Sequence, residues 1–284
     1  MNDRKKRIIS DDFLDKFAKS DGIFHKILKS APKDFLILPR GELVKVYYKG
    51  CKVLDIGKRK IRRYKKGYNS FVDGMDEKDI LENIDNFFTN TKEKIDNRTE
   101  NKLKEKIKQQ EMFLKINEEN NDFFVFDMEY QQHKGETDPR SENGGNDNPR
   151  ADLVAVKSDG TLVLVELKVG GTALDDEKTG IAGHLKSAAD YFSNFQKNEF
   201  EPMIPQVKYL NKWEEKDFKL DWEKTKGYIF ALIDCNNKDK EKIKEQLNNQ
   251  AQEAIKDMEN WQVFFTEKED LSELFTYDEY MKGL

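Results

Sequence analysis

The first part of the chain alternates short apolar runs with turn residues. Phe13, Leu14 and Phe17 lie on one face of a short predicted helix. Three apolar runs follow, and because Pro-Arg-Gly and Lys-Gly steps separate them, they predict an antiparallel β-meander. The predicted strands are residues 35–38, 43–48 and 51–56, a second helix is expected over residues 76–88, and the polar residues 89–100 are expected to form a junction.

From about residue 99 the predicted order is helix, three strands, helix and strand, followed by a further helix and strand. Strands that are apolar on both faces indicate a sheet covered by helices on both sides. We therefore expect an α/β (α+β) fold: a mixed sheet with an αβββαβ core flanked by helices in residues 96–284, preceded by a small α+β domain with the meander in residues 1–95. The predicted elements are a helix over 100–117, strands over 123–130, 151–157 and 161–168, a helix over 178–195, a strand over 228–233, a helix through Ile243 and Ile255, and a strand over 263–265, with a long polar loop at 133–150.

Composition narrows the class of protein. Hydrophobic residues make up 37% of the chain and include 19 Phe, enough for a folded core. No apolar run approaches the ~18 residues that a membrane span needs, and the charged start of the chain resembles no signal peptide, so we expect a cytoplasmic protein that does not enter a membrane. The two cysteines, Cys51 and Cys235, are expected as separate buried thiols. Because the chain has only these and three histidines, it has few residues that could form a zinc site of the His/Cys type.

Charge is segregated along the chain. The formal net charge is −5, but residues 40–66 hold eleven Lys and Arg against two acids, a local charge of +9. A local basic surface can attract polyanions despite an acidic total. Within this stretch Tyr64 could stack on a base, and a solvated loop is the alternative interpretation. The residues proposed for nucleic-acid binding are Lys58, Arg59, Lys60, Arg62, Arg63, Lys65 and Lys66.

The strongest chemical signal is the predicted hairpin over residues 151–168. If Ser158-Asp159-Gly160 forms a three-residue turn, residues whose numbers sum to 318 face one another. Asp152 then lies opposite Glu166, and Lys168 lies on the same face two residues beyond. A two-residue turn would send Asp152 to the other face, so the interpretation depends on this register.

Two adjacent carboxylates at the end of an apolar hairpin are costly unless a cation joins them. Mg²⁺ prefers carboxylate oxygens, so Asp152 and Glu166 are the expected metal ligands, with the main-chain carbonyl of Leu167 as a further oxygen; Mn²⁺ is a candidate substitute. Lys168 could hold a water or neutralise charge on a phosphate. The alternative is a strand-start aspartate beside an ordinary Glu-Lys surface pair.

These residues resemble the PD-(D/E)XK nuclease superfamily, whose motif is an acid at one strand start and acid-any-Lys on the next strand. Here the motif is Asp152 and Glu166-Leu167-Lys168, with Ala151 in place of the motif's proline. The resemblance covers roughly residues 99–235 and implies metal-dependent hydrolysis of phosphodiester bonds. It also implies that Asp152 and Glu166 bind the metal and that Lys168 orients or activates the nucleophile.

Members of that superfamily often add a glutamate from the preceding helix, and Glu111 is our candidate, with Glu105 and Glu118 as rivals. Asp127 and Glu129 either face the metal or mark the solvent end of their strand, and we favour the second interpretation. Related nucleases contact phosphate from the helix after the hairpin, where His184 and Lys186 are candidates for that role or for a surface role.

The sequence thus predicts a magnesium-dependent nuclease, an endonuclease in preference to an exonuclease, acting on DNA in preference to RNA by resemblance alone. The alternatives are an inactive nucleic-acid-binding module of the same fold and a phosphohydrolase of small nucleotides, for which no Gly-rich phosphate loop is present. A homodimer is allowed, and the cleavage specificity and biological pathway stay open.

Overall fold

The computed structural model describes most of the chain and divides it into two compact units. The first unit contains residues 1–114 and 198–217, and the second contains residues 115–197 and 218–284. The division therefore lies beyond the predicted boundary at residue 95, and the chain enters the first unit twice. The residues described are 7–19, 22–58, 61–63, 82–97, 104–131, 150–170, 181, 184–185, 194–248, 255–256 and 261–284.

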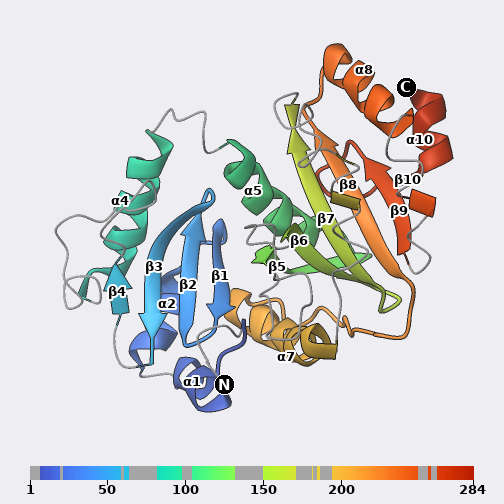
Figure 1. Ribbon diagram of the computed structural model, residues 1–284. Coiled ribbons are helices and arrows are strands. Elements are labelled where there is room, and N and C mark those ends of the chain that lie inside the picture. Colours follow the sequence, from blue (N-terminus) through green and yellow to red (C-terminus); the bar gives the residue numbers. More distant parts are fainter. Residues whose placement is uncertain are drawn as a thin grey trace, which may run out of the picture. The chain divides into compact units, whose positions relative to one another are not determined.

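The first unit is built around a four-stranded antiparallel sheet in the order β1-β2-β3-β4 (Figure 1). The predicted meander is confirmed, and a fourth short strand inside the basic tract extends it. The helices and strands that lie in this unit are α1 (Asp11–Ala18), α2 (Ile23–Ser30), β1 (Phe35–Arg40), β2 (Leu43–Tyr48), β3 (Cys51–Gly57), β4 (Ile61–Arg63) and α4 (Ile84–Asp96).

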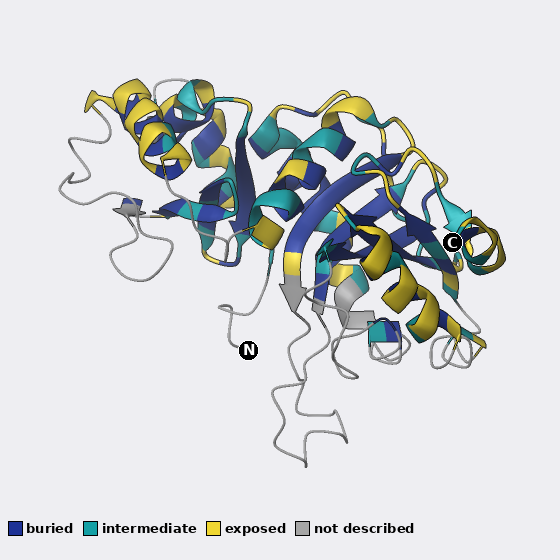
Figure 2. Ribbon diagram, turned by 90° about the horizontal axis from the view of Figure 1, so that it is seen from above, coloured by how far each residue is buried: buried dark blue, intermediate teal, exposed yellow. Residues whose placement is uncertain are grey.

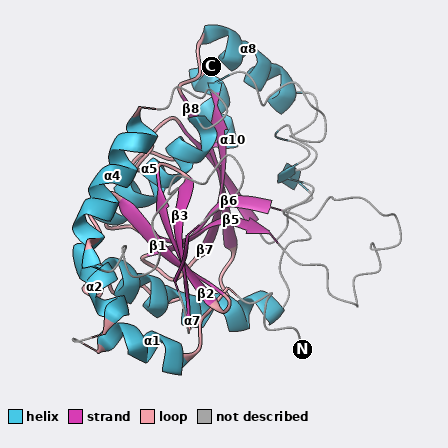
Figure 3. Ribbon diagram, turned by 90° about the vertical axis from the view of Figure 1, so that its left-hand side faces the viewer, coloured by secondary structure: helices cyan, strands magenta, loops and turns pink. Residues whose placement is uncertain are grey.

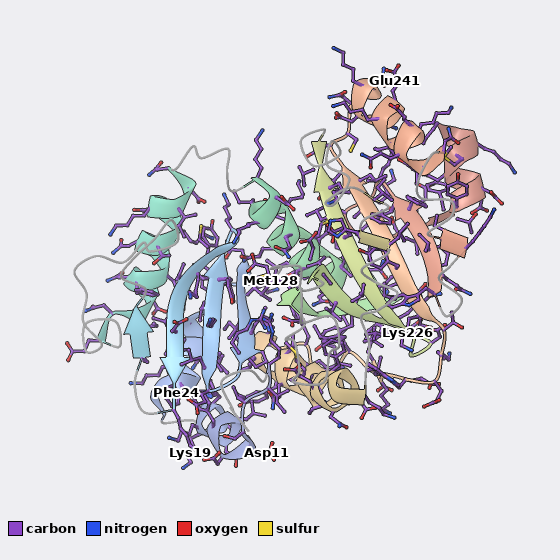
Figure 4. All side chains as sticks on the ribbon, viewed as in Figure 1. Asp11, Lys19, Phe24, Met128, Lys226 and Glu241 are labelled. Atoms are coloured by element: carbon purple, nitrogen blue, oxygen red, sulfur yellow. The ribbon has the colours of Figure 1, made fainter. Side chains whose placement is uncertain are left out.

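One face of this sheet and the helices α1, α2 and α4 enclose a single apolar cluster. The rings of Phe13, Phe17 and Phe24 meet within it, with centroids 5.1 to 5.9 Å apart. Figure 4 labels Phe24 among the side chains. Two differences from the predicted helices appear here. The helix α2 was not predicted, and α4 runs to Asp96, because Thr91 and Ile95 continue the buried face of Ile84 and Phe88 through the expected junction.

The second unit is built around a six-stranded mixed sheet in the order β10-β9-β8-β7-β6-β5. Strands β5, β6 and β7 are antiparallel, whereas β8 lies parallel to both β7 and β9. The protein therefore has the predicted mixed α/β fold class. The elements are β5 (Phe123–Gln131), β6 (Arg150–Lys157), β7 (Leu162–Val169), β8 (Lys226–Ile233), α8 (Asn237–Gln246), β9 (Trp261–Thr266), β10 (Phe275–Thr276) and α10 (Tyr277–Gly283).

Two long helices belong partly to each unit. The first, α5 (Lys104–Glu119), is the predicted one, and the second, α7 (Asn194–Asn211), was not predicted, because Pro202 and Pro205 lie within it. Its buried side chains nevertheless follow helical spacing at Phe200, Met203, Ile204, Val207 and Leu210. Figure 3 distinguishes these helices from the strands of both sheets.

Buried amides complete the main-chain hydrogen bonds at strand edges. Asn117 on α5 donates to the carbonyl of Val125 at 2.8 Å and accepts from its N–H at 2.7 Å, on the edge strand β5. Asn211 on α7 makes the same pair of bonds with Ile37 on the edge strand β1. An edge strand presents unpaired donors and acceptors, so these amides block further strand addition at those residues.

Strands β7 and β8 of the second unit are almost entirely buried, whereas β9 and β10 are more exposed; Figure 2 colours the ribbon by burial. Every residue of β7 from Leu162 to Lys168 is buried, including the charged Glu166 and Lys168. Across the residues described, no helix combines the length and the apolar character that crossing a membrane requires.

Candidate active site

The hairpin of β6 and β7 has the predicted register. Leu153 pairs with Val165 and Val156 with Leu162, so the paired numbers sum to 318. The turn is closed by hydrogen bonds from Lys157 N–H to the Thr161 carbonyl and from Gly160 N–H to the Lys157 carbonyl, both 2.8 Å. Gly160 has a φ of 96°, as the predicted turn requires. Continued by one residue, this register places Asp152 opposite Glu166.

Asp152 interrupts the ladder at the end of the hairpin. In a regular ladder the N–H of Leu167 would be donated to the carbonyl of Ala151, because these residues form a hydrogen-bonded pair in this register. Here the carboxylate of Asp152 accepts that N–H at 2.7 Å from its Oδ2. The half-buried Asp152 side chain is thereby fixed against the main chain of β7, between Glu166 and Lys168.

Glu166 and Lys168 form a buried ion pair on β7. The Lys168 Nζ lies 2.9 Å from the Glu166 Oε1, and the two residues are only 3% and 4% exposed. The parallel strand β8 sets Phe230 and Leu232 opposite them, so apolar neighbours surround the pair. Buried charges need such compensation, and their attraction is stronger there than in water. This burial contradicts the alternative of an ordinary surface pair.

His184 joins this pair from the segment after the hairpin. Its Nε2 lies 3.2 Å from the Lys168 Nζ and 3.2 Å from the Glu166 Oε1. A neutral ring can accept a hydrogen bond from the Lys168 ammonium at Nε2, whereas a ring protonated at Nε2 can donate a hydrogen bond to Glu166. His184 was predicted as a contact to substrate phosphate; its contact with both functional side chains was not foreseen, because the sequence does not fix where that segment packs.

Asp127 is buried on the face that carries the site. It lies opposite Val154 on β6, and Val154 alternates with Asp152, so the two aspartates belong to one face. Asp127 has no solvent exposure, and its Oδ1 accepts the N–H of Met128 at 2.8 Å. The prediction that this residue marks the solvent end of β5 was therefore wrong. Glu129 is exposed, and its φ of 51° departs from strand geometry.

The predicted helix glutamate, Glu111, lies in the part of α5 that belongs to the first unit. It is exposed, and its Oε2 lies 3.4 Å from the Lys108 Nζ. Asp152, Glu166 and Lys168 belong to the second unit. The rivals Glu105 and Glu118 are likewise exposed on α5. A catalytic role for one of these glutamates stays a prediction.

The predicted basic tract is described only in part. Lys58 is exposed, and its ammonium pairs with Asp12 of α1. Arg62 and Arg63 lie in β4, where their main chains pair with Asp55 and Leu54. The remaining residues of the tract, together with Tyr64, Lys186 and the polar loop, lie outside the described residues; from the predicted binding set these are Arg59, Lys60, Lys65, Lys66 and Lys186.

The oxygen donors at the hairpin suit a hard divalent cation. Continued by one residue, the register of β6 and β7 puts Asp152 and Glu166 on one face, and the Asp152 carboxylate accepts the N–H of Leu167, the residue after Glu166. Within the described part of the chain, no three His, Cys, Asp or Glu side chains gather closely enough to hold a metal ion. A metal at this site would therefore be held by two protein carboxylates, with main-chain oxygen and water completing its shell, which is how Mg²⁺ is commonly bound.

Comparisons with protein-family models, with curated proteins and with solved structures found no match to this chain.

Proposed function

We propose that this protein is a metal-dependent nuclease of the PD-(D/E)XK kind, which hydrolyses phosphodiester bonds of nucleic acid. One observation carries the proposal. The register of the β6–β7 hairpin sets Asp152 beside Glu166, and Lys168 lies buried against the same glutamate. Burial of charged groups at one end of an apolar hairpin is costly for folding, so a functional role accounts for their placement there.

Asp152 and Glu166 would hold the metal, with the Leu167 carbonyl as the neighbouring oxygen. A bound Mg²⁺ supplies Lewis-acid charge and lowers the pKa of a coordinated water. The protein contributes rigid placement of its ligands. The Asp152 Oδ2 is fixed by the N–H of Leu167, and Glu166 is held by Lys168, so neither carboxylate is free to rotate away.

Lys168 would act on the attacking water and on the phosphate. Its ammonium is a compact donor of three protons, held by contacts with the Glu166 Oε1 and the His184 Nε2. Its positive charge can orient a water or neutralise charge that develops on a phosphate oxygen. Apolar neighbours on β8 keep bulk water from screening this charge.

Substitution of Lys168 tests the proposal. We expect wild-type protein to cleave plasmid or single-stranded DNA with Mg²⁺ or Mn²⁺ and not with EDTA. Lys168→Met should lower the cleavage rate by about 100-fold or more, because it removes the proton donor while it keeps most of the side-chain volume. Lys157→Met, on the same hairpin but at its turn end, is the matched control and should cleave as wild type does.

Metal binding gives a second measurement that does not depend on turnover. Glu166→Gln should weaken Mn²⁺ binding, measured by titration calorimetry, because a neutral amide is a poorer ligand for a hard cation. Circular dichroism checks that each variant is folded. Equal cleavage by Lys168→Met and wild type would remove the assigned role of the lysine, and metal affinity unchanged in Glu166→Gln would remove the metal site.

The second candidate is a nucleic-acid-binding module that does not turn over. It is favoured by the absence of a three-residue metal cluster among the described side chains. Duplex DNA, single-stranded DNA and RNA of the same sequence distinguish the candidates. Binding of any of them without cleavage under all metals would support the module, whereas metal-dependent cleavage would exclude it and would also identify the substrate.

A further inference from the structure

The residues on either side of His184 anchor it to the second unit. Ile181, His184 and Leu185 have helical conformation, and residues three and four apart lie on one side of a helical turn. Ile181 and Leu185 are fully buried, and the N–H of Ile181 donates to the Gln246 Oε1 at the end of α8, over 3.3 Å. His184 therefore lies on the buried side of its turn, held between two apolar anchors.

His184 contacts the buried pair from its more exposed side. The side chain of His184 is 21% exposed, whereas those of Glu166 and Lys168 are 6% and 4% exposed. Its Nε2 lies 3.2 Å from the Lys168 Nζ and 3.2 Å from the Glu166 Oε1, and the Nζ and the Oε1 are 2.9 Å apart. The three polar atoms thus form a nearly equal-sided triangle, and the imidazole is its most exposed member.

The strand beside the pair offers apolar side chains at the same level of the sheet. Strand β8 sets Phe230 beside Glu166 and Leu232 beside Lys168, and both are buried. A lysine side chain is a compact charge on a flexible four-carbon stem, so polar contacts at its end decide where the ammonium rests. Contact with both Glu166 and His184 restricts the Lys168 Nζ more than the contact with Glu166 does by itself.

We propose that His184 is a positioning residue for the hydrolysis: its imidazole accepts a hydrogen bond from Lys168 and fixes the ammonium against Glu166. This inference rests on the proposed function, in which Lys168 acts on the attacking water and on the phosphate. A misplacement of about 1 Å can lower the rate of an enzyme roughly 100-fold, so a residue that only holds the ammonium in place has a large effect. His184 therefore acts through Lys168.

A positioning role differs in its kinetics from the phosphate contact that the sequence predicted for His184. Loss of a contact that binds substrate and transition state equally raises KM, whereas loss of an interaction that matters only in the transition state lowers kcat. It also differs from a role as metal ligand, because loss of a ligand would weaken metal binding. The three roles are thus separated by kcat, KM and metal affinity.

Kinetics of the full chain on a fluorescein-labelled DNA duplex with Mg²⁺ test the inference. His184→Leu removes the polar ring atoms and should lower kcat by about 10–100-fold. KM, and the Mn²⁺ affinity measured by titration calorimetry, should stay within about twofold of wild type. The matched control is Gln262→Leu, an exposed residue of β9 that is separated from β7 by β8, and its kcat should equal that of wild type.

The conservative variant His184→Gln separates positioning from the structural effect of losing the ring. Its amide can accept from Lys168 and donate to Glu166, so kcat should return to within about threefold of wild type. Circular dichroism checks that each variant is folded. A kcat unchanged in His184→Leu, a raised KM at unchanged kcat, weaker Mn²⁺ binding, or a kcat in His184→Gln as low as in His184→Leu would overturn the inference.

A double-mutant cycle tests the contact without turnover. Urea unfolding midpoints are compared for His184→Leu, Lys168→Met and the double variant. Because residues in contact couple, the double variant should shift the midpoint by less than the sum of the single shifts, and additive shifts would overturn the inference. Its failure is distinct from failure of the proposed function: DNA cleavage with equal kcat in wild type and His184→Leu removes only the role of His184. No cleavage by wild type, together with non-additive shifts, removes the nuclease function and leaves the contact as a structural one.

Discussion

At the scale of the residue, the structure buries charge in two ways. Glu166 and Lys168 bury opposite charges that offset one another at 2.9 Å. Lys45 is instead placed among like charges, with Asp55 as its acidic neighbour. The first arrangement holds a carboxylate and an ammonium in position, whereas the second lowers the pKa of Lys45. Both are costly for folding.

The lowered pKa of Lys45 predicts that the stability of the protein depends on pH. The pKa of Lys45 is lowered to about 8 by burial and by Lys52, from an ordinary value of 10.5. Between these two pH values the unfolded chain binds more protons than the folded chain, so the free energy of unfolding rises with pH. Below pH 8 the full cost of burying the charged Lys45 lowers the stability. Lys45→Met removes the titrating ammonium and with it this penalty. The variant's free energy of unfolding minus that of wild type should therefore be about 1–2 kcal/mol larger at pH 7 than at pH 10.5, after allowance for solvent screening.

Urea unfolding at pH 7, 9 and 10.5 measures this difference. Lys29→Met, on the exposed surface of α2, is the control and should follow wild type at every pH. Parallel stability curves for Lys45→Met and wild type would show that Lys45 carries no such penalty.

Residue patterns alone were enough to select the candidate catalytic groups. Glu166 follows four consecutive aliphatic residues and Lys168 follows Leu167, so their burial was expected from the strand itself. The contact with His184 and the burial of Asp127 were not, because both depend on packing between segments that are distant in sequence. No local pattern fixes such contacts.

At the scale of the element, the turn of the hairpin determines the candidate site. Gly160 has a φ of 96°, and a Cβ built there would lie 2.9 Å from the Cβ of Asp221. Other residues rarely adopt this backbone conformation. The three-residue turn therefore depends on glycine, and the turn sets the register that brings Asp152 opposite Glu166.

Gly160→Ala should accordingly destabilise the protein by about 1–3 kcal/mol, through the positive φ and the contact with Asp221. The measurement is the free energy of unfolding in urea. Gly283→Ala is the matched control, since a Cβ at Gly283 would meet no atom within 4 Å, and it should change stability by less than about 0.5 kcal/mol. Equal stability of the two variants would mean that the turn tolerates a side chain.

Strands with strong turn signals were predicted closely, whereas helices were predicted less well. The three strands of the meander and the β6–β7 hairpin lie within a residue or two of their predicted positions. The helix α7 was missed because its two prolines argue against a helix, although its apolar spacing is helical. Tertiary burial of that apolar face outweighs the local penalty.

At the scale of the whole molecule, the chain passes between the two units three times, after residues 114, 197 and 217. Residues 198–217 return to the first unit after three of the six strands of the second unit's sheet, and the other three follow later in the chain. They provide Leu210 to the apolar cluster and amides that bond the main chains of Ile9 and Ile37. The first unit is therefore incomplete without a segment that is distant in sequence.

A fragment of residues 1–114 should consequently lack cooperative folding. Loss of the Leu210 side chain alone should cost about 2–5 kcal/mol, and each main-chain group left without its amide partner about 1–3 kcal/mol. Circular dichroism during heating provides the measurement. The same fragment joined to residues 198–217 by a Gly/Ser linker is the control and should regain a cooperative transition. A cooperative transition of the shorter fragment would show that the returning segment is dispensable.

The sequence by itself determined the elements whose signal is local: the meander, the hairpin register, and the strands on which Asp152, Glu166 and Lys168 lie. These follow from strand alternation and turn chemistry, which act over a few residues. Only the tertiary structure decided the unit boundaries, the place of α7, the contact of His184 with the buried pair, and the pairing of Lys49 with Asp96 and of Lys58 with Asp12. Those depend on which distant segments pack together to bury apolar surface, and burial is a property of the folded chain as a whole.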